Sequence, residues 1–262
     1  MRGPRTQLLR GAEQVRSVRI IGPGRVGLSF ASALSASGWR VAGILGRNDD
    51  PRGAAHGVDL VLVTTPDDAI RRTAALVEPV ASTVLAHTSG THTLDTLEPH
   101  VRRASLHPLA SIPDPSVGAD RLRDHCAFAV DGDPIAAEIV AALGGRPFHV
   151  ADGQRVRYHA AACVASNHLV ALLGQVERIA DSAGVPLEAY LDLAAQTLEN
   201  VRRLGPAAAL TGPVARGDWA TVARHLDALP LDEQVAYRAL ADQADRLVTG
   251  RAEAEGDASE VA

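Results

Sequence analysis

The stretch Ser17-Val18-Arg19-Ile20-Ile21-Gly22-Pro23-Gly24-Arg25-Val26-Gly27 decides the fold. Residues 17–21 are rich in β-branched side chains, which is typical of a buried strand, and a segment with helical spacing continues from Gly27 to Ser37. Between the two, the glycines follow the spacing GxGxxG. The sequence therefore predicts a strand, a glycine turn and a helix, as in the first unit of a parallel sheet.

Each glycine of this turn has its own physical reason. In a dinucleotide-binding sheet the first allows the tight turn, the second lets a pyrophosphate approach the backbone, and the third lets the helix pack closely. The amides that open the helix then bind the phosphates. A purely structural turn is the alternative. The expected cofactor-binding residues of the turn are Gly22, Pro23, Gly24, Arg25, Val26 and Gly27.

The loop after the second predicted strand, residues 39–45, indicates which dinucleotide binds. An NAD site normally carries an acidic residue there, whereas this chain has Arg47. A fixed cation suits the 2′-phosphate of NADP, so we expect NADP, with NAD less favoured. The alternative is that Arg47 is only a solvated loop residue and that Asp49 or Asp50 binds the ribose.

Strands and helices continue to alternate up to residue 152, which predicts right-handed βαβ units and a parallel sheet. The further strands are expected at residues 59–65, 83–87, 127–130 and 147–150, and the helices at residues 67–77 and 134–143. Beyond that point the spacing is helical only. Helices are expected at residues 154–183, 187–204, 219–226 and 232–248.

The predicted fold class is therefore α/β, with a Rossmann-like parallel-sheet domain followed by an all-α C-terminal domain. The first covers residues 17–152 and the second covers residues 153–249. Residues 1–16 are expected to form a flexible arm, and the acidic, aperiodic residues 250–262 a disordered tail.

Polar residues gather where the predicted strands end, and in an open parallel sheet the ligand lies outside those carboxyl ends. Thr64, Thr65 and Pro66 would border the cofactor ribose, although they also suit a helix cap. Ser89 would lie at the nicotinamide end, and His107 could reach the same crevice. For His107 the alternative is a turn residue before proline.

The long helix from residue 154 carries an unusual polar stripe. At 100° per residue, His159, Cys163, Ser166 and Asn167 fall close to one face. Burying such groups without partners is costly, so we expect them to meet a substrate or the other domain. Helix packing with internally satisfied hydrogen bonds is the alternative.

Composition excludes several classes of function. All 26 basic residues are Arg and none is Lys, which excludes a Schiff-base lysine and a Walker-type phosphate lysine. The net charge of -5 argues against nucleic-acid binding. The two cysteines and the histidines show no metal-ligand spacing, and no apolar run is long enough to span a bilayer. We expect a cytoplasmic protein with no metal, membrane or nucleic-acid partner.

Six motifs carry a resemblance to a known family: GPGRVG (22–27), TTPDDAI (64–70), HTSG (87–90), SLHPL (105–109), RYHAAACVASNHLVAL (157–172) and ALTGPVARGD (209–218). Together they resemble a bacterial two-domain family with a Rossmann-like N-terminal domain and a helical C-terminal domain of unknown function. That family is similar in layout to ketopantoate reductase, pyrroline-5-carboxylate reductase and the 6-phosphogluconate dehydrogenase-like oxidoreductases. The resemblance implies hydride transfer from NADPH to a small carbonyl or imine substrate, and a homodimer built through the C-terminal helices.

The resemblance also implies roles for particular residues. Several relatives place a lysine four residues before an asparagine, and here Asn167 matches the asparagine while Cys163 replaces the lysine. His159, one turn earlier, is the best substitute proton donor, because an imidazole with its ordinary pKa of about 6.5 suits proton delivery near neutrality. Arg216 could clamp a substrate carboxylate; alternatively, its segment is a turn in which Asp218 caps the next helix.

Two functions are compatible with these residues. The first is an NADP-dependent oxidoreductase with His159, Asn167, Ser89 and His107 as catalytic candidates. Ser166 and Arg216 are then the candidates for substrate binding. The second is a non-catalytic dinucleotide-binding sensor or assembly module, which the missing lysine favours.

Overall fold

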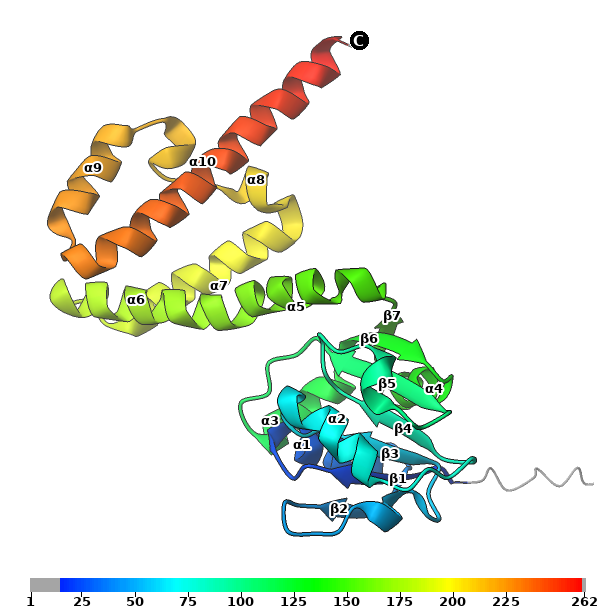
Figure 1. The fold of residues 1–262 in the computed structure, drawn as a ribbon. Helices are drawn as coiled ribbons and strands as arrows, with labels where there is room; N and C mark the ends of the chain where they lie inside the picture. The colour runs from blue at the N-terminus through cyan, green and yellow to red at the C-terminus, as the bar shows by residue number, and fades with distance from the viewer. Residues whose placement is uncertain (1–14, 261–262) are drawn as a thin grey trace, which may run out of the picture. The chain divides into compact units, whose positions relative to one another are not determined.

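The computed structural model describes residues 15–260, so the predicted arm at residues 1–16 lies almost entirely outside the described residues. The chain divides into two compact units, Met1–Ser166 and Asn167–Ala262. The first is a seven-stranded, mostly parallel sheet with helices, and the second is helical, which gives an α/β fold with a Rossmann-like first unit (Figure 1). The division falls within the long helix and not at its start near residue 153.

The sheet has the strand order β2-β1-β3-β4-β5-β6-β7 (Figure 1). Strands β1 to β5 pair in parallel, β5 and β6 pair antiparallel, and β6 and β7 pair in parallel. The strands are β1 Ser17–Ile21, β2 Arg40–Leu45, β3 Leu60–Val63, β4 Val84–His87, β5 Arg103–Pro108, β6 Ala127–Gly132 and β7 Arg146–Phe148. The helices of this part are α1 Arg25–Ala36, α2 Asp67–Leu76, α3 Pro115–Arg123 and α4 Ile135–Ala142.

Strand β5 and helix α3 were not predicted from the sequence, and the expected parallel sheet is wrong for the β5–β6 pair. Strand β5 begins with a charged residue, Arg103, and ends at Pro108, so it lacks the apolar run of the other strands. Helix α3 has few apolar residues, but its start is well specified. The Asp114 carboxylate accepts hydrogen bonds from the amides of Ser116 and Val117.

The sheet buries both of its faces. In β3, Leu60 and Leu62 belong to one hydrophobic cluster and Val61 and Val63 to the other, as the two-residue period of a strand requires. Residues of α1, α3 and α4 complete the first cluster, and residues of α2 complete the second. Both faces are covered, so the carboxyl edge of the sheet is where polar side chains can meet a ligand.

The predicted continuous helix at 154–183 is divided into three parts: α5 Arg155–Cys163, a π-helical turn Val164–His168 and α6 Leu169–Ser182. The other helices are α7 Leu187–Leu204, α8 Pro206–Ala209, α9 Trp219–Ala228 and α10 Leu231–Glu260. The structure differs from the predicted disordered tail, because α10 continues to Glu260. Alanine and glutamate are frequent in that segment, and both are strong helix formers.

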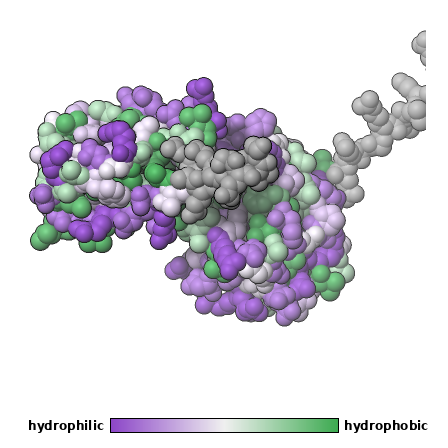
Figure 2. All heavy atoms as spheres, turned by 90° about the horizontal axis from the view of Figure 1, so that it is seen from above, coloured by the Kyte–Doolittle hydropathy of each residue, from purple (hydrophilic) through white to green (hydrophobic). Residues whose placement is uncertain are grey.

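The helical unit buries little apolar surface. Within its described side chains, residues 167–250, the buried hydrophobic residues are Ala180, Val222 and Ala241. Large apolar side chains remain exposed on α6, α7 and α10, and Figure 2 shows apolar residues scattered among polar ones over the visible surface. No helix of the described chain combines the length and the apolar character that crossing a membrane requires.

His87, at the end of β4, is fully buried and neutral. Its Nδ1 accepts the amide hydrogen of Ser89 at 3.2 Å, while its Nε2 lies 3.3 Å from the carbonyl oxygen of Thr93. Because a carbonyl oxygen can only accept, Nε2 must carry the ring hydrogen. Burial, through desolvation, lowers the pKa of His87 to about 4.

The lowered pKa of His87 predicts that acid destabilises the folded chain. The unfolded chain binds a proton at His87 below pH 6.5 and the folded chain does so only near pH 4, so its contribution to stability is complete above pH 6.5 and is lost as the pH falls toward 4. The difference between these two pKa values corresponds to roughly 3 kcal/mol of unfolding free energy. Urea unfolding at about pH 7.5 and about pH 4.5 should therefore show a smaller loss for His87→Gln than for the wild type. Equal losses would contradict a neutral His87.

Candidate functional site

The glycine turn is held by contacts that a side chain would prevent. The amide of Gly22 donates to the carbonyl oxygen of Leu45 at 2.9 Å, and the Thr64 hydroxyl donates to the carbonyl oxygen of Gly22 at 2.8 Å. A Cβ atom on Gly27 would lie 2.0 Å from that same oxygen, and one on Gly22, whose φ is +114°, would lie 2.9 Å from the backbone of Thr64. The turn therefore joins β1, β3 and α1 at backbone contact distance.

Gly24 differs from its two neighbours. No atom lies within 4 Å of the position that its Cβ would occupy. Gly24 is also the N-cap of α1, where no side chain caps the helix and the first turn contains no acidic residue. The amides of that turn are the positive end of a 12-residue helix, so this end of α1 can receive an anion.

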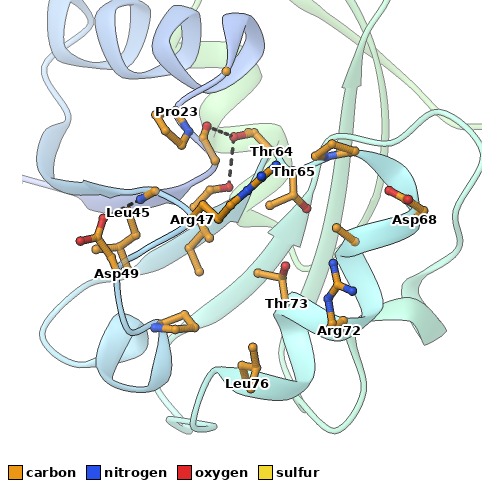
Figure 3. Close-up of a pocket in the computed structure, with 17 residues that line it drawn as sticks. Pro23, Leu45, Arg47, Asp49, Thr64, Thr65, Asp68, Arg72, Thr73 and Leu76 are labelled. Atoms are coloured by element: carbon orange, nitrogen blue, oxygen red, sulfur yellow. Dashed lines mark hydrogen bonds between the residues drawn. The ribbon is translucent and has the colours of Figure 1, made fainter.

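A cavity of about 580 Å³ opens beside this turn (Figure 3). Its walls come from the glycine turn, the loop after β2, the end of β3 and helix α2. The lining residues are Ile21, Gly22, Pro23, Gly24, Leu45, Gly46, Arg47, Asp49, Pro51, Thr64, Thr65, Pro66, Asp68, Ala69, Arg72, Thr73 and Leu76. Most of the residues expected to bind a cofactor thus lie at one cavity, while Arg25, Val26 and Gly27 are not among its lining residues.

Two arginines approach this cavity from different elements, Arg47 from the loop after β2 and Arg72 from α2 (Figure 3). Both are exposed, and neither forms an ion pair within the part of the chain that the structure describes. Helical spacing identifies α2 but not which of its arginines faces the cavity, so the sequence analysis missed Arg72.

The acidic residues of the same loop have partners within the loop. The Asp49 carboxylate accepts the amide hydrogen of Gly46 at 2.7 Å, and Asp50 pairs with Arg52 at 3.0 Å. These contacts use the two carboxylates that could have bound a ribose in place of Arg47. The free cation of the loop favours a phosphate over a ribose diol.

Thr65 carries an unpartnered polar atom at the edge of the cavity. Its Oγ1 is buried and forms no hydrogen bond with any described residue. A buried hydroxyl without a partner is costly, and a bound ligand is one of the few ways to satisfy it. The open position above Gly24, the uncapped start of α1 and this hydroxyl all fit a dinucleotide.

Ser89 and Asp67 organise the loop after β4. The buried Ser89 hydroxyl donates to the Asp67 carboxylate at 2.7 Å and accepts the amides of Thr91 and His92, each at 3.2 Å. The hydroxyl proton therefore has a protein partner, which leaves Ser89 a loop-forming role at the carboxyl edge.

A second group of polar side chains lies at the carboxyl ends of β4 and β5. His107 lies 2.6 Å, Nδ1 to hydroxyl, from Tyr158 of α5, and the His107 and His159 ring centroids are 5.8 Å apart. The Cys163 sulfur lies 3.8 Å from His159 Nδ1. The structure thus brings together His107 and His159, two residues predicted separately for the site, and adds Tyr158, which was not predicted from the sequence.

Three further residues predicted for the site are divided between the two units. Ser166 is the last residue of the first unit, while Asn167 and Arg216 belong to the second. Asp218 caps α9, since its carboxylate accepts the amide of Thr221 at 3.0 Å, and this confirms the capping role considered for its segment.

Solved structures share this fold. A candidate NADP oxidoreductase from Bacteroides fragilis is 19% identical, with a TM-score of 0.73 over 88% of this chain and 98% of that one. A Thermotoga maritima protein is 23% identical, with a TM-score of 0.69 over 89% and 99%. Pyrroline carboxylate reductase from Plasmodium falciparum, solved with NADP bound, is 12% identical, with a TM-score of 0.59 over 91% and 100%.

At the level of sequence, the search of curated proteins found no match. Residues 126–244, which include the end of the sheet and most of the helical unit, match the family model described as a domain of unknown function, DUF2520.

Proposed function

We propose that this chain is an NADP-dependent oxidoreductase that reduces a small carbonyl or imine compound bearing a carboxylate. The observation that carries the proposal is the cavity at the glycine turn, where unoccupied space at Gly24, an uncapped helix start and two free arginines meet. Structures with this fold include a reductase with NADP bound and a candidate NADP oxidoreductase, which supports the same class of cofactor.

Different residues of the cavity bind different parts of the dinucleotide. The amides after Gly24 bind the pyrophosphate, and the Thr65 hydroxyl binds a ribose. Arg47 and Arg72 hold the 2′-phosphate between them, as charge-assisted hydrogen bonds to phosphate favour arginine. When bound, NADPH supplies the hydride.

The protein's own groups supply the proton and the orientation. His159 gives a proton to the oxygen or nitrogen that the reduction leaves negative. The roles expected for Asn167 in orienting the substrate carbonyl, and for Ser166 and Arg216 in binding its carboxylate, stay predictions. The loop at Ser89 borders the nicotinamide.

Gly24 and Gly27 predict different outcomes for the same substitution to alanine. Gly24→Ala places a methyl group in open space, so we expect an unchanged melting temperature but an NADPH dissociation constant raised at least about tenfold, or 1.4 kcal/mol. Gly27→Ala overlaps a backbone oxygen and should lower the unfolding free energy by about 1–3 kcal/mol or more.

Calorimetry and thermal melting of both variants check this prediction. Gly153→Ala is the matched control, because its Cβ also meets no atom within 4 Å but lies outside the cavity lining. Tight NADPH binding by Gly24→Ala would contradict the placement of the pyrophosphate.

The arginine pair predicts coenzyme preference. Arg47→Ala and Arg72→Ala should each weaken NADPH binding about 10- to 100-fold, the equivalent of one charge-assisted contact, and leave NADH binding nearly unchanged. Arg71→Ala is the control, because Arg71 is an exposed neighbour on α2 outside the cavity lining. If NADPH and NADH binding were weakened equally, or if only Arg71→Ala weakened NADPH binding, the proposed contact of Arg47 and Arg72 with the 2′-phosphate would be wrong.

Catalysis is tested with NADPH oxidation against a panel of keto acids and cyclic imines. We expect turnover of at least one compound, and a loss of about 10²–10⁴-fold in His159→Ala, as removal of a general acid produces. His56→Ala, at an exposed surface histidine, is the control. NADPH binding without oxidation across the panel would favour the non-catalytic sensor or assembly module.

We further propose that the chain forms a homodimer through its C-terminal helices. A helical unit with so few buried apolar residues gains stability by covering its exposed leucines, such as Leu193, Leu198 and Leu204, with a second copy. Sedimentation at micromolar concentration should give twice the mass of the 27.4 kDa chain. A monomer mass would refute the dimer.

A further inference from the structure

Helix α5 is fixed to the sheet by a buried arginine at its first residue. The Arg155 guanidinium is 2% exposed and donates to Ser105 Oγ at 3.1 Å, to the Asp131 carboxylate at 3.2 Å and to the Asp152 carboxylate at 3.1 Å. These contacts bind α5 to β5 and β6. Tyr158, three residues later on the same helix face, is thereby set against β5.

The hydrogen bond between the Tyr158 hydroxyl and the His107 ring has one favoured direction, in which the hydroxyl is the donor. Their 2.6 Å contact is the only hydrogen bond that the described residues offer to either group. If His107 Nδ1 were the donor, both the phenol hydrogen and Nε2 would lack a partner among the described residues, whereas a phenol that donates leaves only the Nε2 hydrogen without one. The hydrogen of the neutral imidazole then lies on Nε2.

Burial keeps the Tyr158 phenol protonated and the His107 imidazole neutral. Desolvation raises the pKa of Tyr158 to about 12, so the phenol keeps its proton. Desolvation also lowers the pKa of His107 to about 4. The charged or titratable groups that act on this ring are His159 and Arg155, which lower its pKa further, and Asp67, which raises it.

The Nε2 side of His107 faces the loop after β4. A Cβ on Gly90 would lie 3.1 Å from both Cε1 and Nε2 of His107 and 2.6 Å from Cδ2 of His159. Nε2 has no hydrogen-bond partner among the described residues and does not belong to the fully buried polar atoms. An N–H donor is therefore open at the carboxyl edge of the sheet, where parallel sheets bind their ligands.

We propose that Tyr158 is a positioning residue that holds His107 as the neutral Nε2–H tautomer, and that this N–H donates to a carbonyl or carboxylate oxygen of the ligand. The role is distinct from that of His159, because His107 donates a hydrogen bond and transfers no proton. It stabilises the negative charge that develops on the oxygen. Only the nature of the ligand rests on the proposed reductase function; the tautomer does not.

The tautomer is measured on the full chain with ¹⁵N-labelled histidine, by long-range ¹H–¹⁵N spectra from about pH 5.5 to 8.5. His107→Gln assigns the signals. We expect a neutral Nε2–H ring that does not titrate in this range, and a mixture of tautomers in Tyr158→Phe. Tyr237→Phe is the matched control, because Tyr237 makes the same 2.6 Å contact with His225. A proton on Nδ1, or titration near pH 6.5, would overturn the proposal.

The donor role is measured with the compound that NADPH reduces. His107→Ala should lower kcat/KM by about 10²–10³-fold, as loss of one oxyanion donor does. His107→Gln, which keeps an N–H donor, should recover part of that loss, and the pH profile should not move. Loss of activity in both variants alike would refute the donor role. If the wild type reduces nothing, the reductase proposal fails and the spectra still decide the tautomer.

Discussion

The close approach of Gly27 to the carbonyl oxygen of Gly22 is the constraint on which the site depends. A methyl group would stand 2.0 Å from that oxygen, so only glycine lets α1 begin against β1. The same oxygen accepts the Thr64 hydroxyl, which ties the end of β3 to the turn. One contact is between backbones and the other joins the Thr64 side chain to the same backbone oxygen, and together they bring the open amides of α1 and the unpartnered Thr65 hydroxyl to one cavity.

The other end of the carboxyl edge depends on Arg155. A buried guanidinium needs its charge paired and hydrogen-bonded, and here Asp131 and Asp152 pair the charge while Ser105 accepts a further hydrogen bond. This arginine fixes the position of α5, and with it the rings that meet Gly90. The cavity and the histidine pair thus depend on different features. The cavity depends on glycines that have no side chain, and the position of the histidine pair depends on the buried ion pairs of Arg155.

The sequence was most informative where chemistry is local. The turn, most of the strands and the cap at Asp218 follow from glycine spacing, alternation and side-chain type. Strand β5 escaped prediction because Arg103 and Pro108 obscure its apolar centre, and its antiparallel pairing with β6 could not be foreseen from alternation. The π-helical turn Val164–His168 likewise departs from the regular 100° projection used for the polar stripe.

The site residues that could not be predicted from the sequence are those whose roles depend on contacts between distant parts of the chain. Arg72 faces the cavity and Arg71 does not, a difference set by how α2 packs on the sheet. Tyr158 meets His107 across 51 positions of sequence, and no local pattern encodes that pairing. Ser89 has the residue type of a catalytic group, but its hydroxyl is used by Asp67, which only the folded loop reveals.

The open amides at Gly24 have a consequence for how this protein responds to its surroundings. Main-chain N–H groups do not ionise, and guanidinium groups keep their charge at any pH a cell experiences. The donors that hold an anion at this end of the sheet therefore keep their hydrogens and their charge across that range, so a change in binding strength with pH would come from the anion and not from its donors.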